Sequence, residues 1–206
     1  LYIASKVVDK ENIYAIMMPT KYTSKDSLED AEIIAKSIGV NYDIKSISTI
    51  LDALNDSFIN DFKGMKEDIT EENFQARIRG IVLMGFANKF KGMVLATSNK
   101  SELAVGYSTI YGDMVGGFCV LKDVPKTLVY KLANYINEHY DAIPKRIITK
   151  EPTAELKFNQ TDQDNLPNYE ILDEIINLYI EKKISPSSII KKGYNAQTVE
   201  KVVKLI

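Results

Sequence analysis

The chain has 206 residues, of which 45% are hydrophobic and 26% are charged, and its formal net charge is −2. This size and composition are ordinary for one globular domain with a full core, and the slightly acidic balance argues against a dedicated nucleic-acid binder. No apolar run approaches the ~18 residues that a membrane span requires. The single cysteine, Cys119, excludes a disulfide framework and a multi-cysteine zinc site, so a reducing cytoplasm is the expected setting.

The two ends of the chain lack helix boundary signals. Residues 1–8 predict a helix already in progress, with no capping residue before it. Residues 199–206 predict an amphipathic helix with no stop signal after it. We therefore expect residues 1–206 to form a single domain that is incomplete at both ends.

Strands and helices alternate through the first half of the chain. Residues 13–18 are a continuous apolar run ended by Pro19, which is typical of a fully buried parallel strand. Ser27 predicts the cap of a helix that Gly39 closes. Residues 41–47 then predict a second strand, residues 48–62 a helix, and residues 70–90 a long helix with apolar side chains at helical spacing.

The second half begins with a third predicted strand at residues 93–96, and a helix is predicted over residues 124–138. Residues 151–167 carry few large apolar residues and no periodicity, and a loop of this length is usually functional, often as a lid. Three further helices are predicted at residues 169–180, 187–192 and 197–206. This alternation predicts an α/β fold with a parallel sheet flanked by helices.

Residues 97–126 are the most informative segment, because they hold four of the ten glycines and follow a predicted strand. Ligands of α/β proteins bind where strands end, and glycine lets the backbone approach them closely. Glu102 offers the oxygen ligand that Mg²⁺ prefers, but Asn99 and Glu102 also have the spacing of a helix-capping box. Lys126, at a predicted helix start, could reach a phosphate or be a plain surface lysine.

A second group of candidates lies on the long helix and after the first strand. Asn73 and Arg77 are four residues apart and would share a helix face. Together with Arg79 they could hold an anionic or amide ligand, since a guanidinium suits a phosphate or carboxylate; a solvated face is the alternative. The hydroxyl-rich residues 20–24 follow the first strand, at a position suited to a ligand or to a simple helix entry. Tyr111, Gly112 and Asp113 suggest either a ligand loop or a turn.

The remaining candidates lie near the predicted lid or carry no motif. Lys150 and Thr153 offer a cation and a hydroxyl beside an acid-rich stretch, although a solvated loop would explain them equally well. His139 is the only histidine and has charged helical neighbours, so a surface or structural role is expected. Cys119, between two apolar residues, is expected to be a small core residue.

Seven sequence blocks stand in one characteristic order. They are MPT at 18–20 with YTS at 22–24, ENFQARIR at 72–79, TSNKSE at 97–102, YGD at 111–113, DVPK at 123–126, KEPTAEL at 150–156 and QTDQD at 160–164. Together they resemble the synthetase domain of NAD synthetases, within the ATP pyrophosphatases that carry a phosphate loop. The resemblance covers nearly the whole chain, and seven ordered blocks are far more specific than any one of them.

The resemblance implies an adenine-nucleotide α-hydrolase-like fold and ATP-dependent amidation of nicotinic acid adenine dinucleotide (deamido-NAD) to NAD. ATP would first adenylate the nicotinate carboxylate and release pyrophosphate. Ammonia, supplied directly or from glutamine, would then displace AMP. The resemblance also implies Mg²⁺ as cofactor, a homodimer and, in the glutamine-dependent form, an additional amidase domain.

The resemblance also implies two sets of ligand contacts by position. The ATP contacts are Thr20, Thr97, Lys126 and Thr153. The deamido-NAD contacts are Asn73, Arg77 and Glu102, and Glu102 is also the implied Mg²⁺ ligand. Residues 151–164 correspond to a lid that would keep water from competing with ammonia for the adenylate.

The chain departs from the family pattern in three places. A Ser-Gly-Gly-x-Asp-Ser phosphate loop is absent and is expected before Leu1, and a lysine-arginine pair is expected beyond Ile206. Ile110 stands where some ammonia-dependent members carry lysine, so it receives no ligand role. Residues 167–173 look more like the glutamine-dependent form. Without a phosphate loop, residues 1–206 alone are expected not to turn over ATP.

Two alternative functions stay open at this stage. One is a related ATP pyrophosphatase amidotransferase that resembles GMP synthetase. The other is a non-catalytic module for nucleotide binding or dimerisation. Use of deamido-NAD as substrate would separate the first from an NAD synthetase, and a natural sequence without the phosphate loop would favour the second.

Overall fold

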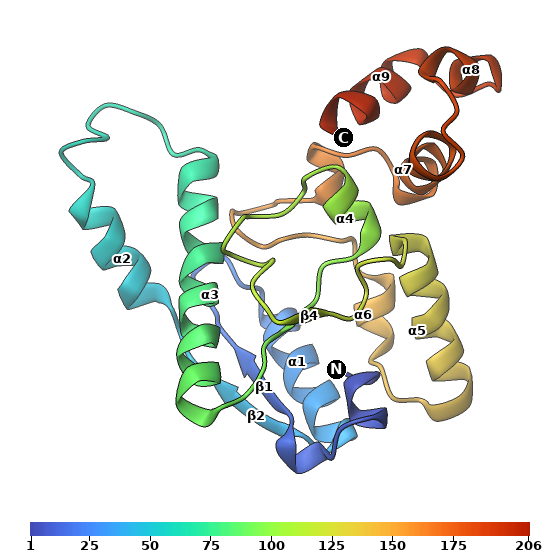
Figure 1. The fold of residues 1–206 in the computed structure, drawn as a ribbon. Helices are drawn as coiled ribbons and strands as arrows, with labels where there is room; N and C mark the ends of the chain where they lie inside the picture. The colour runs from blue at the N-terminus through green and yellow to red at the C-terminus, as the bar shows by residue number, and fades with distance from the viewer.

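The computed structural model describes Leu1–Ile206 and shows strands and helices in alternation, followed by a group of helices at the C-terminal end (Figure 1). The strands are β1 (Tyr14–Met17), β2 (Asn41–Ile44), β3 (Leu95–Ala96) and β4 (Phe118–Cys119). The α-helices are α1 (Lys25–Ile38), α2 (Ser48–Ser57), α3 (Ile69–Phe90), α4 (Lys100–Ala104), α5 (Lys126–Tyr140), α6 (Lys145–Thr149), α7 (Tyr169–Ile176), α8 (Pro186–Lys191) and α9 (Ala196–Leu205). Short 3-10 helices are η1 (Ala4–Lys6), η2 (Lys10–Asn12) and η3 (Asp162–Asp164), and η4 (Asn177–Glu181) is a π-helix.

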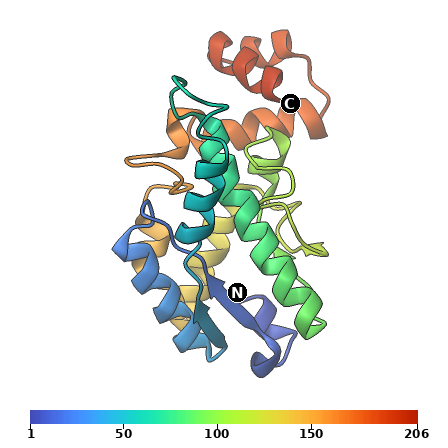
Figure 2. The same cartoon turned by 90° about the vertical axis from the view of Figure 1, so that its left-hand side faces the viewer.

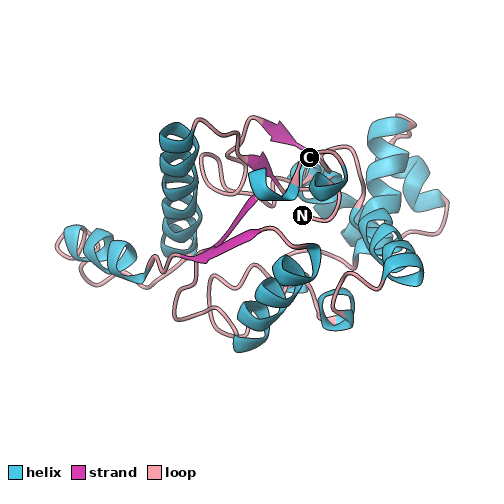
Figure 3. Cartoon of the chain, turned by 90° about the horizontal axis from the view of Figure 1, so that it is seen from below, coloured by secondary structure: helices cyan, strands magenta, loops and turns pink.

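The strands form two parallel ladders, which Figure 3 shows as separate pairs. β1 pairs with β2 with Tyr14 opposite Asn41, and β3 pairs with β4 with Leu95 opposite Phe118. The parallel arrangement confirms the predicted fold class. The prediction that the first strand is fully buried is wrong, because the Tyr14 side chain at its start is 66% exposed.

Polar N-cap side chains stand at the start of several helices, including α1 and α4. Ser24, rather than the predicted Ser27, is the N-cap of α1, because the Ser24 hydroxyl accepts a hydrogen bond from the Ser27 N–H. Gly39 closes α1 in the left-handed conformation at φ 81°, as predicted. At α4, Asn99 and Glu102 make both reciprocal bonds of a capping box, which confirms that interpretation of their spacing.

The helix predicted over residues 1–8 is wrong, because only the 3-10 turn η1 forms there. The Ser5 hydroxyl donates to the Tyr2 carbonyl, a local bond that competes with helical pairing. The helix predicted over residues 48–62 ends earlier, at Ser57, where the serine hydroxyl donates to the Ala53 carbonyl. The two-residue strand β4 and the five-residue helix α6 were not predicted.

The largest buried cluster joins the C-terminal helices to α4. Its members are Val105, Leu166, Tyr169, Leu172, Ile175, Ile176, Ile189, Val199 and Val202. Helix α7 contacts both α4 and α5, so it connects the C-terminal helices to the rest of the chain. Figure 2 shows these helices gathered at one end of the molecule. None of the helices combines the length and apolar character that crossing a bilayer would require.

Helix α3 packs closely on the loop that follows α4. A side chain at Gly80 would lie 2.8 Å from the Tyr111 carbonyl oxygen, and one at Gly112 would lie 2.9 Å from the Ala76 Cβ. Glycine is therefore required on both sides of this contact. The contact places the loop that carries Thr109 and Asp113 beside α3.

Candidate functional site

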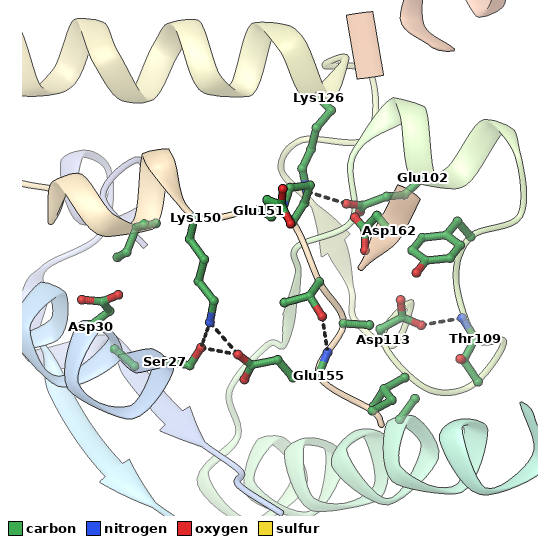
Figure 4. Close-up of a pocket in the computed structure, with 18 of the residues that line it drawn as sticks. Ser27, Asp30, Glu102, Thr109, Asp113, Lys126, Lys150, Glu151, Glu155 and Asp162 are labelled. Atoms are coloured by element: carbon green, nitrogen blue, oxygen red, sulfur yellow. Dashed lines mark hydrogen bonds and ion pairs between the residues drawn. The ribbon is translucent and has the colours of Figure 1, made fainter. Parts of the chain in front are cut away.

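A cavity of about 590 Å³ opens between α1, α3, α4, α5 and the segment after α6. Figure 4 shows side chains from these elements converging on it. Its polar lining residues are Ser27, Asp30, Arg79, Glu102, Tyr107, Thr109, Asp113, Lys126, Tyr130, Lys150, Glu151, Thr153, Glu155 and Asp162. The cavity therefore brings cations, carboxylates and hydroxyl groups together from distant parts of the sequence.

Lys126 and Glu102 form an ion pair at one wall of this cavity (Figure 4). The Lys126 Nζ lies 2.8 Å from the Glu102 Oε1, and both side chains are 19% exposed. The other Glu102 oxygen accepts a hydrogen bond from the Asn99 N–H at 3.3 Å, which is the capping bond. Glu102 therefore caps α4 and also faces the cavity, and its role as a Mg²⁺ ligand stays a prediction.

Glu155 connects the segment after α6 to the start of α1. Its carboxylate accepts hydrogen bonds from the Ser24 hydroxyl at 2.8 Å, the Ser27 hydroxyl at 2.8 Å and the Lys150 Nζ at 2.6 Å. Burial acts to raise the pKa of Glu155, but these hydrogen bonds outweigh it and leave the pKa lowered. Glu155 also holds a left-handed φ of 51°, so this set of bonds stabilises a strained residue.

Two carboxylates lie at the end of the cavity near the loop after α4: Asp162, which is buried, and Asp113, which is exposed at the surface. The Asp113 Oδ1 accepts from the Thr109 N–H at 2.6 Å, and partial desolvation of the carboxyl group by the surrounding protein nevertheless raises the pKa of Asp113. The Asp162 Oδ2 accepts from the Tyr169 hydroxyl at 2.7 Å. Burial, followed by the hydrogen bond to Asp162, raises the pKa of the Tyr169 hydroxyl, so this tyrosine stays protonated. The Asp162 Oδ1 is buried without a hydrogen-bond partner, which is a costly arrangement.

The opposite wall of the cavity is fixed by Arg146. Its Nε donates to both oxygens of Asp30, at 3.1 and 3.0 Å, and its other nitrogens reach Asp26 and Glu29. These hydrogen bonds, the one to Asp30 first, raise the pKa of the Arg146 guanidinium. These bonds of the Arg146 guanidinium anchor α6 to α1 and so position the segment that follows α6.

The cavity brings together three of the predicted site residues, Glu102, Lys126 and Thr153. Thr97 is exposed and does not line it. Thr20 is buried with its hydroxyl donating to Gln75 at 3.1 Å, and it lines a separate cavity of about 110 Å³. The ligand roles of Thr20 and Thr97 stay predictions.

The two predicted residues of α3 also lie outside the cavity lining. The Asn73 Oδ1 accepts from the Thr109 hydroxyl at 2.8 Å, so Asn73 lies directly behind a residue that does line the cavity. Arg77 is exposed, and its Nε donates to the Ile110 carbonyl at 3.3 Å. Their roles as deamido-NAD contacts likewise stay predictions.

Arg79, the third candidate on the long helix, does line the cavity. Its Nε donates to the Met18 carbonyl at 3.1 Å, and burial lowers the pKa of its guanidinium. Arg79 lies three and four positions after the buried Ala76 and Gln75 and so shares their face of α3. Tyr107 and Tyr130 also line the cavity, and no sequence signal pointed to either of them.

Neither His139 nor Cys119 was expected to have a site role, and the expectation that Cys119 is a core residue is wrong. His139 is exposed, and its Nδ1 lies 2.8 Å from the Tyr135 carbonyl oxygen in the same helix. Cys119 is half-buried rather than fully buried, and its Sγ lies 3.1 Å from the Ser98 carbonyl oxygen. Neither residue lines the cavity.

Parallel strands alternating with helices, and a polar cavity built from cations and carboxylates, define the class of α/β nucleotide-binding proteins. The family model for NAD synthase matches residues 1–206. The chain belongs to the NAD synthase family.

Curated relatives support this assignment across the whole chain. It is 48% identical over 206 residues to the glutamine-dependent NAD(+) synthetase of Thermotoga maritima, covering 99% of this chain and 36% of the relative. It is 50% identical over 208 residues to the enzyme of the same description from Acinetobacter baylyi, covering all of this chain and 38% of the relative. The chain therefore spans little more than a third of the length of these relatives.

Solved structures support the same family assignment. Glutamine-dependent NAD+ synthetase from Acinetobacter baumannii, in complex with ADP, matches with a TM-score of 0.71 and 45% identity, covering all of this chain and 37% of that one. The NH3-dependent NAD synthetase from Campylobacter jejuni matches with a TM-score of 0.69 and 29% identity, covering 95% of this chain and 72% of that one. NMN synthetase from Francisella tularensis has a TM-score of 0.76, but at 23% identity it shows the fold alone.

Proposed function

We propose that the protein containing this chain amidates deamido-NAD to NAD, using ATP and forming an adenylated intermediate. The observation that carries this proposal is the convergence of Glu102, Lys126 and Thr153 on one cavity from three separate elements. These three residues belong to three of the ordered sequence blocks, and membership of the NAD synthase family supports the same chemistry.

The proposed reaction has two balanced steps. The nicotinate carboxylate oxygen attacks the α-phosphorus of ATP, and the bond from that phosphorus to the bridging oxygen of the β-phosphate breaks to release pyrophosphate. The ammonia nitrogen then attacks the adenylated carbonyl carbon, the bond to the phosphate oxygen breaks, and AMP and a proton leave. A carboxylate needs this activation because its own oxygen is a poor leaving group.

The lysine side chains that line the cavity would stabilise the negative charge that develops in the first step. Negative charge builds on the departing pyrophosphate, and fixed cations aimed at that charge are a large term in such transfers. Lys126 and Lys150 line the cavity, and each is now paired with a carboxylate, Glu102 or Glu155. Bound phosphates would share or replace these partners. The Thr153 hydroxyl would add a hydrogen bond to the nucleotide.

Exclusion of water supports the second step. Water competes with ammonia for the adenylate, so the site must close over it. Residues 150–156 border the cavity and are tied to α1 by the Glu155 bonds. We assign residues 151–164 the role of the lid.

The residues present fit a Mg²⁺ ion that arrives with ATP. Mg²⁺ is commonly bound by one or two carboxylates together with phosphate oxygens and waters, and no group of three or more acidic, histidine or cysteine side chains forms a complete metal site here. Glu102 would hold the ion, since it offers a carboxylate on the cavity wall. The bound ion would neutralise charge on the phosphates.

The nitrogen source and assembly are also part of the proposal. The first relatives given above are glutamine-dependent and far longer than this chain, which supports glutamine as donor through an amidase domain in the full-length protein. Helix α3 supports a homodimer, because it exposes the apolar residues Ile81, Met84 and Phe90. The single cysteine keeps a reducing cytoplasm as the expected compartment.

The direct test uses the natural full-length protein with ATP, Mg²⁺, deamido-NAD and an ammonium salt, with products separated by chromatography. Formation of NAD and AMP in equal amounts is the expected result. A parallel reaction with glutamine in place of ammonium identifies the natural nitrogen donor. No NAD from a folded protein that binds ATP would refute the proposal and favour a related ATP pyrophosphatase.

A further inference from the structure

Helix α5, which begins with Lys126, receives its N-terminal hydrogen-bond acceptors from two other helices. Its N-cap residue is Pro125, which has no side-chain acceptor, although the first N–H groups of a helix lack intrahelical partners. The Lys126 N–H donates instead to the Ser101 hydroxyl of α4, at 2.8 Å. The Thr127 N–H donates to the Asp173 Oδ2 of α7, at 2.9 Å.

Asp173 is the centre of this arrangement. It is only 9% exposed, and its Oδ2 also accepts from the Thr127 hydroxyl at 2.7 Å. Its Oδ1 accepts from the Ser101 hydroxyl. Burying a carboxylate is costly unless hydrogen bonds compensate, and all three bonds of Asp173 go to groups that hold the start of α5.

The same face of α7 supports the Lys126 side chain. Tyr169 lies four residues before Asp173, so the two share a helix face. The Tyr169 ring centroid is 5.3 Å from the Lys126 Nζ, within cation–π range. Asp173 therefore fixes the Lys126 backbone while Tyr169 lies under its ammonium group.

We propose that Asp173 is a positioning residue for Lys126, an assignment that rests on the role given to Lys126 in the proposed function. Asp173 does not line the cavity and acts through the lysine. Its negative charge also neutralises the positive end of α5 and occupies an N–H group there. Phosphates of the nucleotide would therefore meet the Lys126 side chain rather than the helix terminus.

The effect of substituting Asp173 should differ according to whether it is only a helix cap or a positioning residue for Lys126. Loss of a cap lowers stability by the same amount whatever side chain stands at position 126. Loss of a positioning residue matters only while the positioned group is present, so its effect on catalysis must depend on Lys126. Double-mutant cycles measure this dependence.

The experiment compares the full-length protein with its Asp173→Asn, Lys126→Ala and doubly substituted forms. The kcat and KM for ATP, the Kd for ATP by calorimetry and the melting temperature are measured for each. We expect Asp173→Asn to lower kcat/KM at least about tenfold when Lys126 is present, and by less than about twofold in the Lys126→Ala background. Glu174→Gln, the next residue of α7 and exposed, is the matched control with unchanged kinetics.

Equal losses from Asp173→Asn in both backgrounds would overturn the proposal and leave Asp173 as a cap alone. If the unsubstituted protein forms no NAD, the proposed function fails separately, and the Kd for ATP then tests the inference through the same cycle. If Asp173→Asn does not fold, Thr127→Val replaces it. That variant removes the hydroxyl donor to Asp173 but keeps the backbone N–H, and the same dependence on Lys126 is expected.

Discussion

The two oxygens of Glu102 have separate partners, and this separation makes its functions distinguishable. Oε2 completes the capping box of α4 with Asn99, while Oε1 pairs with Lys126 at the cavity. Helix α3 contains the same kind of capping box, in which the Glu71 Oε2 accepts from the Asp68 N–H at 2.8 Å. Glu71 therefore offers a matched control for the capping part of Glu102.

We predict that Glu102→Ala abolishes NAD formation, with a loss of at least about 100-fold, because removing a group that stabilises transition-state charge costs about that much. Its stability should fall by only about 0.5–2 kcal/mol, the value of a cap. Glu71→Ala should lose similar stability and keep its turnover. Melting temperature and NAD formation are measured together; equal activity of the two variants would leave Glu102 with a capping role only.

At the scale of elements, the contact between α3 and the loop after α4 depends on Gly80. A Cβ at this position would lie 2.8 Å from the Tyr111 carbonyl oxygen and 3.3 Å from that of Gly112. Backbone atoms cannot move aside as a flexible side chain can. Gly85 lies on the same helix, and a Cβ there would meet no atom within 4 Å.

We predict opposite effects for the two glycines of α3. Gly80→Ala should destabilise the protein by about 1–3 kcal/mol through overpacking and should displace the loop that carries Asp113, lowering turnover. Gly85→Ala should raise stability by up to about 1 kcal/mol, because alanine is the better helix former. Urea unfolding of both variants gives the comparison, and a stabilising Gly80→Ala would refute the close packing described above.

The bonds of Glu155 join two elements and should respond to acid. Because its pKa is lowered in the folded state, its contribution to stability is present above the unfolded value of 4.5. That contribution is lost as pH falls below 4.5 and through the folded pKa, when the carboxylate takes up a proton. The bonds from Ser24, Ser27 and Lys150 then lose their charged acceptor.

We therefore predict that Glu155→Gln is less stable than the unsubstituted protein at pH 7, by about 1.5–3 kcal/mol, the value of hydrogen bonds to a charged group. The difference should shrink as pH falls below 4.5. Denaturant unfolding at a series of pH values measures it, with Glu151→Gln, an exposed neighbour, as control. A difference that stays constant with pH would show that the charge of Glu155 contributes nothing.

The elements with strong local signals could be predicted from the sequence, but contacts between distant residues could not. The patterns of β1, α1, α3 and α5 placed these elements within a few residues of their observed ends. Strand β4 has two residues and depends on pairing with β3, so no periodicity reveals it. Similarly, the ordered blocks pointed to Glu102 and Lys126 separately, whereas their ion pair, like the link from Glu155 to Ser24 across 131 positions, depends on the fold.

At the scale of the whole molecule, α3 carries apolar side chains on more than one face. Ile78 is buried against α2, whereas Ile81 and Phe90 are 71% and 70% exposed. Large apolar side chains that are exposed together often mark an interaction surface. Figure 1 shows α3 on the side of the molecule opposite α5, with α2 beside it. A second copy of the chain could cover the exposed apolar side chains of α3.

The homodimer proposal therefore predicts that a charge on the exposed face of α3 weakens self-association. Ile81→Glu should lower the oligomeric state of the full-length protein, because an unpaired carboxylate would be buried at the proposed interface. Ile33→Glu, the same change at an exposed position of α1, should leave it unaltered. Size-exclusion chromatography with light scattering measures both. If Ile81→Glu keeps the assembly of the unsubstituted protein over a range of concentrations, the exposed face of α3 does not form the interface, and another surface must support any dimer.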